Sequence, residues 1–152
     1  MTELFEFEAD FANSLRCIPM LVRYKLDTCG VKLKLHHWNQ LSSAERQQVL
    51  VAPCESATEI QAYRSLLHQL VQSHLGEVPA DLPVDDRPDW NNLAKIPESV
   101  QQQGEAVGTA LSLEQWISLT PLQRFALIKL SRSNHENRNF LPALKEFHLT
   151  EP

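Results

Sequence analysis

Glycine, basic residues and long apolar runs are all scarce in this sequence. Only four glycines occur in 152 residues, which argues against a turn-rich all-β design. Acidic residues number 19 against 14 Lys and Arg, giving a formal net charge of −5, and a surface that neutralises phosphates needs the opposite balance. No apolar run has bilayer length, and residues 1–6 are acidic where a secretory signal would be basic. We therefore expect a cytoplasmic globular protein that binds neither nucleic acid nor a membrane.

Cysteine is also sparse and widely spaced. Cys17, Cys29 and Cys54 are separated by 12 and 25 residues, whereas ligand pairs of structural metal sites usually lie two to four residues apart. An odd number of distant thiols favours reduced, buried cysteines over a disulfide framework. We expect no native disulfide and no bound cofactor.

Sequence motifs of catalysis are missing as well. The chain has no Gly-x-Ser-x-Gly elbow, no His-Glu-x-x-His pair, no phosphate-binding glycine loop and no dinucleotide fingerprint. The sequence therefore predicts a protein that is not an enzyme.

An internal repeat appears when the sequence is aligned with itself at an offset of 78. Nine identities fall between positions 18 and 46, where average composition gives about two. The identical positions of the first copy are Ile18, Pro19, Val22, Gly30, Leu33, Leu35, Trp38, Leu41 and Arg46. We predict a single domain, 1–152, that contains tandem helical repeats at about 18–75 and 96–147.

Proline and glycine mark the ends of the first helix of each copy. Pro suits a first helical turn and Gly the position after the last, which predicts helices at 19–29 and 97–107. Capping boxes that begin at Ser42 and Thr120 predict helices at 43–51 and 121–131, and a box at Ser112 predicts a short helix.

Apolar spacing predicts a further helix after each copy. A long stripe from Ile60 to His74 ends at Gly76, and its weaker counterpart at 134–147 contains Pro142, which would kink the helix or begin a new one.

Two segments lack helical patterns. Residues 76–95 are rich in proline and aspartate, which predicts an extended surface connector without a regular ladder. Residues 4–9 alternate at period two, so they predict a short strand or an extended arm that lays Phe5 and Phe7 on the body. The predicted fold is an all-α compact bundle of two repeats with an N-terminal arm and a central connector.

Aromatic and arginine side chains are the candidate contact residues. Trp38 and Trp116 share a repeat register, which favours packing between helices over ligand stacking. Arg46 and Arg124 also share one, and internal bracing is favoured over binding a phosphate. Trp90 lies in the acidic connector without a repeat partner, so it is the better candidate for contact with another protein, with docking onto the body of this chain as the equal alternative.

The adjacent histidines His36 and His37 are the densest imidazole cluster. Their repeat equivalents are Glu114 and Gln115, so the fold does not need imidazole there, and an exposed turn is favoured over a functional pair. The alternative is a metal or cluster site in which the fold gathers Cys17, Cys29, Cys54, His36 and His37.

Several strings resemble one known family. They are Phe5-Glu6-Phe7-Glu8, Leu15-Arg16-Cys17-Ile18-Pro19-Met20, Lys25-Leu26-Asp27-Thr28-Cys29-Gly30, Gln123-Arg124-Phe125-Ala126-Leu127 and Phe140-Leu141-Pro142-Ala143-Leu144-Lys145-Glu146-Phe147. These strings resemble the cyanobacterial nitrate reductase-associated protein family. They are spread along the chain, so the resemblance covers nearly its whole length. Members of that family lie beside genes for nitrate reductase and molybdopterin synthesis, and some are thought necessary for an active reductase without taking part in catalysis.

The resemblance implies a pathway and supplies no catalytic motif. It implies a factor that binds nitrate reductase during assembly or insertion of the molybdenum cofactor, with Trp90, Phe5, Phe7, Arg46 and Arg124 as candidate partner-binding residues. Two alternatives stay open: a small-molecule, metal or cluster carrier, and a regulator that modulates turnover of the reductase.

Overall fold

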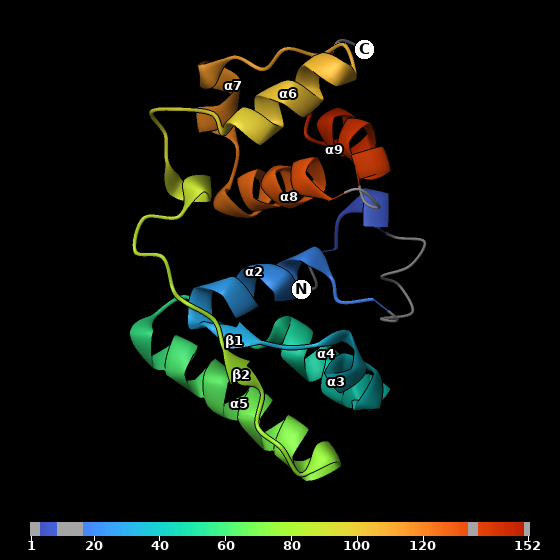
Figure 1. The fold of residues 1–152 in the computed structure, drawn as a ribbon, viewed down its shortest axis with the longest axis vertical. Helices are drawn as coiled ribbons and strands as arrows, with labels where there is room; N and C mark the ends of the chain where they lie inside the picture. The colour runs from blue at the N-terminus through green and yellow to red at the C-terminus, as the bar shows by residue number, and fades with distance from the viewer. Residues whose placement is uncertain (1–3, 9–16, 134–136, 151–152) are drawn as a thin grey trace. The chain divides into compact units, whose positions relative to one another are not determined.

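The computed structural model describes residues 4–8, 17–133 and 137–150, and within these ranges the protein is mostly helical (Figure 1). The chain divides into two compact units. Unit 1 comprises residues 1–4 and 8–84, and unit 2 comprises residues 5–7 and 85–152. The division falls inside the predicted connector, so its two halves belong to different units. The predicted all-α class is confirmed.

Unit 1 is built around one long helix. Its elements are α2 (Met20–Cys29), β1 (Val31–Lys32), α3 (Leu35–Gln40), α4 (Ser43–Val51), α5 (Ala57–Leu75) and β2 (Ala80–Asp81). Helices α2, α3 and α4 all contact α5, which presents Tyr63, Leu67 and Val71 to the core on one apolar stripe. The predicted long helix and its end at Gly76 are confirmed, since Gly76 caps α5 at φ 68°.

Unit 2 is organised around α8. Its elements are η2 (Asp89–Asn91), α6 (Glu98–Ala106), α7 (Leu113–Ser118), α8 (Pro121–Arg132), η3 (Asn137–Asn139) and α9 (Phe140–Glu146). Helices α6 and α9 and both 3-10 turns contact α8. Pro142 lies in the first turn of α9, where the missing N–H would have no helical partner in any case. The structure therefore selects the second option for Pro142, a new helix start.

Hydroxyl side chains cap four of the eight described α-helices, α4, α5, α7 and α8. Ser42, Ser56, Ser112 and Thr120 each accept a hydrogen bond from the backbone N–H three residues on, at 3.1 Å, and the residue at that third position reaches back. The predicted helices at 43–51 and 121–131 and the short helix that contains Trp116 are confirmed.

Equivalent elements in the two units lie 78 residues apart. Helix α3 begins at Leu35 and α7 at Leu113, and Gly30 and Gly108 both adopt a positive φ. Each unit thus runs from a helix through a glycine turn to a short helix and a capped helix. A common origin by duplication stays a prediction from the sequence.

Two predictions about the segments without helical pattern are wrong in part. The connector does form a ladder, because Ala80 and Asp81 of β2 pair with Lys32 and Val31 of β1. Residues Glu6–Glu8 form a 3-10 turn, η1, in place of an extended arm. The first three residues of the helix predicted at 134–147 lie outside the described residues. Within the described part of the chain, no helix is long and apolar enough to cross a bilayer.

Candidate functional site

Each unit contains a joint, the junction between a short helix that carries a buried indole and the capped helix that follows it: α3 and α4 in unit 1, and α7 and α8 in unit 2. Trp38 of α3 and Trp116 of α7 are fully buried. The Trp116 Nε1 donates to the carbonyl of Asn92 at 2.9 Å, so the indole also fastens the end of η2. Both rings are therefore part of the core, as predicted, and neither is exposed as a stacking platform.

An arginine braces each joint from the first turn of the following helix. Arg46 donates to the carbonyls of Trp38 at 3.1 Å and Asn39 at 3.0 Å, and its guanidinium lies 5.9 Å from the Trp38 ring centroid. Arg124 is buried and donates to the carbonyls of Trp116, Ile117 and Leu119. The carbonyls of Trp38 and Trp116 also accept the backbone N–H groups of Leu41 and Leu119. The guanidinium adds donors for the other carbonyls at the helix end, which the helix itself leaves short of partners. Both arginines make the internal contacts expected for bracing.

Trp90 docks on its own unit. Its ring meets Phe125 edge to face, with centroids 5.1 Å apart, and its carbonyl accepts a hydrogen bond from Arg124. The side chain is half-buried, so α8 covers part of the ring and the rest stays accessible.

Phe5 and Phe7 belong to an aromatic cluster with Phe147. The two rings stack at 5.2 Å, and Phe147 meets both of them edge-on. The Phe7 N–H donates to the Glu146 carboxylate at 3.1 Å. These phenylalanines lie on the body of unit 2, as the sequence predicted. The 3-10 turn brings the two rings closer together than the spacing of residues i and i+2 along a strand would.

Among the described residues, the structure does not gather the three cysteines with the two histidines into one group of potential ligands. Cys17, Cys29 and Cys54 are free thiols, and Cys29 and Cys54 are buried. The interaction between the two thiols, together with burial, raises the pKa of Cys54, and the same interaction lowers the pKa of Cys29. Among the described residues, the cysteines belong to no group of three potential ligands.

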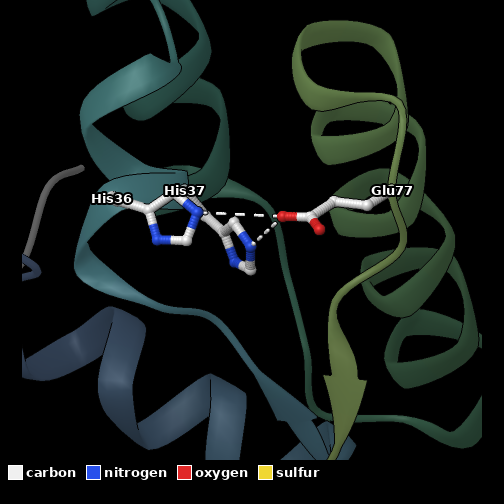
Figure 2. A group of neighbouring side chains, drawn as sticks. All are labelled: His36, His37 and Glu77. Carbon is white, nitrogen blue, oxygen red and sulfur yellow. Dashed lines mark hydrogen bonds and ion pairs between the residues drawn. The ribbon is translucent and has the colours of Figure 1, made fainter.

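The histidine pair lies on a helix, which corrects the expected exposed turn. His36 is 56% exposed but His37 only 3%, and both reach the Glu77 carboxylate from α3 (Figure 2). The backbone N–H of Lys34 donates to His37 Nδ1 at 3.1 Å, so an imidazole closes the box that begins α3. The sequence did not predict α3, because lysine is not a capping residue. It did not predict the contact with Glu77 either, because Glu77 is 40 residues from His37.

Two buried charged side chains gave no signal in the sequence. Glu8 is 2% exposed and accepts the N–H of Met20 at 3.1 Å, so it caps α2, whose N-cap Pro19 offers no side-chain acceptor. Lys25 is 9% exposed and donates to the carbonyls of Leu50 and Ala52 at the end of α4. Both contacts bind orphan groups at a helix end, and both bring together residues that local patterns cannot connect.

Comparison with known proteins identifies the family. The chain matches the family described as conserved nitrate reductase-associated protein over residues 4–147. It belongs to this family. No curated protein sequence and no solved structure matched the chain.

Exposed apolar side chains occur on the short helix of unit 2. Leu113 and Ile117 are 39% and 45% exposed and lie one turn apart on α7. Leu93, 45% exposed, follows the Asn92 carbonyl to which Trp116 donates. In unit 1 the residue at the register of Ile117 is the polar Asn39. The sequence did not single out these residues. It shows Leu113 and Ile117 on either side of Trp116, but not that the indole is buried and the two aliphatic side chains are exposed.

Proposed function

We propose that this protein is a non-catalytic accessory factor that binds nitrate reductase in the cytoplasm while the enzyme acquires its molybdenum cofactor or cluster. The observation that supports it is the family match, which covers nearly the whole chain and gives association with nitrate reductase as the family's description. In this proposal, the protein contributes binding energy and no chemistry of its own.

The exposed face of α7 is the contact surface we propose for the reductase. Protein interfaces concentrate binding energy in a few apolar side chains held on a rigid support. Leu113 and Ile117 meet that description, because Trp116 between them is fully buried and Arg124 binds the helix-end carbonyls. The half-buried Trp90, fixed against Phe125, offers a second anchor in the same unit.

Metal content of the reductase tests the maturation role. Nitrate reductase should be purified from cells with and without this protein, and its molybdenum and iron should be measured per polypeptide. We expect the enzyme from the deficient cells to be inactive and depleted in molybdenum, iron or both. Normal metal content with lowered activity would instead support a regulator, and normal activity would refute an accessory role.

Binding of the apo-reductase tests the contact surface. The double variant Leu113→Ser, Ile117→Ser should weaken binding about tenfold or more, since burial of two such side chains contributes roughly 1 to 3 kcal/mol each. Leu35→Ser is the matched control, because Leu35 occupies the register of Leu113 in unit 1 and is 53% exposed. Equal loss in both variants would show that α7 has no special role, whereas no binding by the unmodified protein would contradict the proposal itself.

A further inference from the structure

His36, His37 and Glu77 form a compact group of potential metal ligands in unit 1. One ligand atom from each, the two imidazole nitrogens and a carboxylate oxygen, all lie within 4.8 Å of one another. Figure 2 shows both rings directed at the Glu77 carboxylate from α3. We propose that these three side chains bind a divalent transition-metal ion of the Zn²⁺ or Fe²⁺ class.

The distances between the ligands fit a shared ion. Bonds of about 2.0 to 2.1 Å in a tetrahedral site place neighbouring ligand atoms roughly 3.3 Å apart. The Glu77 Oε1 lies 3.1 Å from His37 Nε2 and 3.7 Å from His36 Nε2. These two distances are within a few tenths of an ångström of that value, and the two imidazole nitrogens lie within 4.8 Å of each other. Rotation of the exposed His36 side chain can bring its nitrogen into the same coordination sphere.

The types of ligand select the class of ion. Two imidazoles and one carboxylate suit zinc and non-haem iron, whereas Mg²⁺ and Ca²⁺ prefer sites made of oxygen alone. Three protein ligands leave at least one coordination position open to water or another ligand. His36 and Glu77 are each more than half exposed, so the ion can reach the site and leave it without unfolding the unit.

The backbone holds the two sides of the site independently. Helix α5 ends at Leu75, and Gly76 takes a left-handed conformation at φ 68° that turns the chain into Glu77. Helix α3 contacts α5, and its first turn carries both histidines. The carboxylate is thus presented to the rings by a glycine cap, and a local pattern in the sequence would not reveal the pairing.

One hydrogen bond opposes metal binding. His37 Nδ1 accepts the N–H of Lys34, so the neutral ring carries its proton on Nε2, the atom that faces Glu77. A metal on Nε2 moves that proton to Nδ1, where it meets the Lys34 N–H. Binding must therefore displace this cap, which lowers the affinity relative to a site whose second nitrogen donates to an acceptor.

This opposition gives a variant that should improve the site. Lys34 is exposed, with φ −79° and ψ 157°, angles that proline adopts readily. Proline already occupies the N-caps of α2 and α6 in this protein. Lys34→Pro removes the competing N–H and should raise the affinity for Zn²⁺ about fivefold, the gain expected from sparing one hydrogen bond. A purely structural role for the histidines predicts no binding and no such gain.

Calorimetric titration of the chelator-treated full chain with ZnCl₂ and, anaerobically, with FeCl₂ measures the binding, with MgCl₂ as the negative ion. We expect one Zn²⁺ or Fe²⁺ per chain. His36→Gln and Glu77→Gln should each weaken it at least about tenfold, and both sites are exposed enough for the variants to stay folded. His74→Gln is the control, because His74 pairs with Glu45 at 2.7 Å and belongs to no group of three potential ligands in the part of the chain that the structure describes. Absence of binding, or binding equal in the His36, Glu77 and His74 variants, would overturn the proposal.

Nuclear magnetic resonance of the imidazole nitrogens gives a second readout. The His37 proton should lie on Nε2 in the metal-free protein and on Nδ1 after addition of Zn²⁺. Retention of the Nε2 proton at saturating Zn²⁺ would exclude His37 as a ligand. The metal site and the accessory role can fail separately. The titration tests metal binding by this chain without nitrate reductase. Restoration of reductase activity by the Glu77→Gln protein would show that the accessory role does not need the metal site.

Discussion

The two joints share a sequence pattern but differ in what covers them. Arg46 is half-exposed and binds two carbonyls of its joint, whereas Arg124 is 5% exposed and binds three carbonyls of its joint together with that of Trp90. The additional carbonyl comes from η2, which packs on α8. Identical local chemistry therefore gives a surface brace in unit 1 and a buried one in unit 2.

The glycine turns show the reverse arrangement. The N–H of Leu82 donates to the Gly30 carbonyl at 2.8 Å, and Arg64 donates to the same carbonyl. A Cβ at Gly30 would lie 2.7 Å from Val84 Cγ2, while one at Gly108 would meet nothing within 4 Å. The first half of the connector thus covers the turn of unit 1, and the second half covers the joint of unit 2. The local sequence around each glycine specifies the turn, and the connector determines which of the two turns is buried.

Substitution of the two arginines should produce the largest difference. Arg124→Ala removes the guanidinium donor from the carbonyls of Trp90, Ile117 and Leu119, while the Trp116 carbonyl keeps the N–H of Leu119. It should lower the free energy of unfolding by about 3 kcal/mol. Arg46→Ala should cost about 1 kcal/mol or less, because water reaches its carbonyls. Urea denaturation followed by circular dichroism measures both. Equal losses would show that burial of the joint does not matter.

Alanine at the two glycine turns should give the next largest difference. A positive φ costs a non-glycine residue roughly 1 kcal/mol, and this is the whole expected cost of Gly108→Ala. Gly30→Ala adds contacts with Val84 and the Leu82 carbonyl, for a total of about 2 to 3 kcal/mol. The same denaturation measurement applies. A larger loss for Gly108→Ala would contradict the assignment of the connector's first half as the cover.

The capping boxes of α4 and α8 should differ in their response to acid. Hydrogen bonding from the Ser42 backbone, and secondarily from His74, lowers the pKa of Glu45, whereas α8 uses the neutral Gln123. A lowered folded-state pKa gives stability that is present above the unfolded pKa and lost as the pH falls through the folded one.

Glu45→Gln should therefore cost less than about 1 kcal/mol at pH 7, given the partial exposure. Its stability should converge on that of the parent from about pH 5 downward. Gln123→Glu should give α8 the pH dependence that Glu45 gives α4, so its added stability should appear only above about pH 5. Parallel pH profiles for parent and Glu45→Gln would argue that the carboxylate does not support the cap.

The surface of α7 should show the smallest effect on stability. Ile117→Asn introduces the residue that unit 1 has at this register, and the exposed side chain should change the free energy of unfolding by under about 0.5 kcal/mol. A larger loss would mean that Ile117 supports the fold, and its use as a probe of partner binding would then fail.

Interactions between residues close in sequence could be predicted, whereas those between distant residues could not. Helices with a hydroxyl cap, such as those after Ser42 and Thr120, were predicted because the cap and its partner lie three residues apart. Helix α3 was missed because its box uses a lysine N–H and an imidazole. The candidate residues Trp90, Arg46 and Arg124 were found from composition and register, but their partners were not.

By itself the sequence determined the all-helical class, the positions of the capped helices and the glycine turns, and the family. These depend on hydrogen bonds and apolar spacings within a few residues, which the chain carries locally. Only the tertiary structure decided that Glu8 caps α2, that Lys25 binds the end of α4, and that Glu77 meets two histidines 40 and 41 residues away. Such contacts depend on how the chain returns on itself, and burial then strengthens polar pairs that no periodic pattern records.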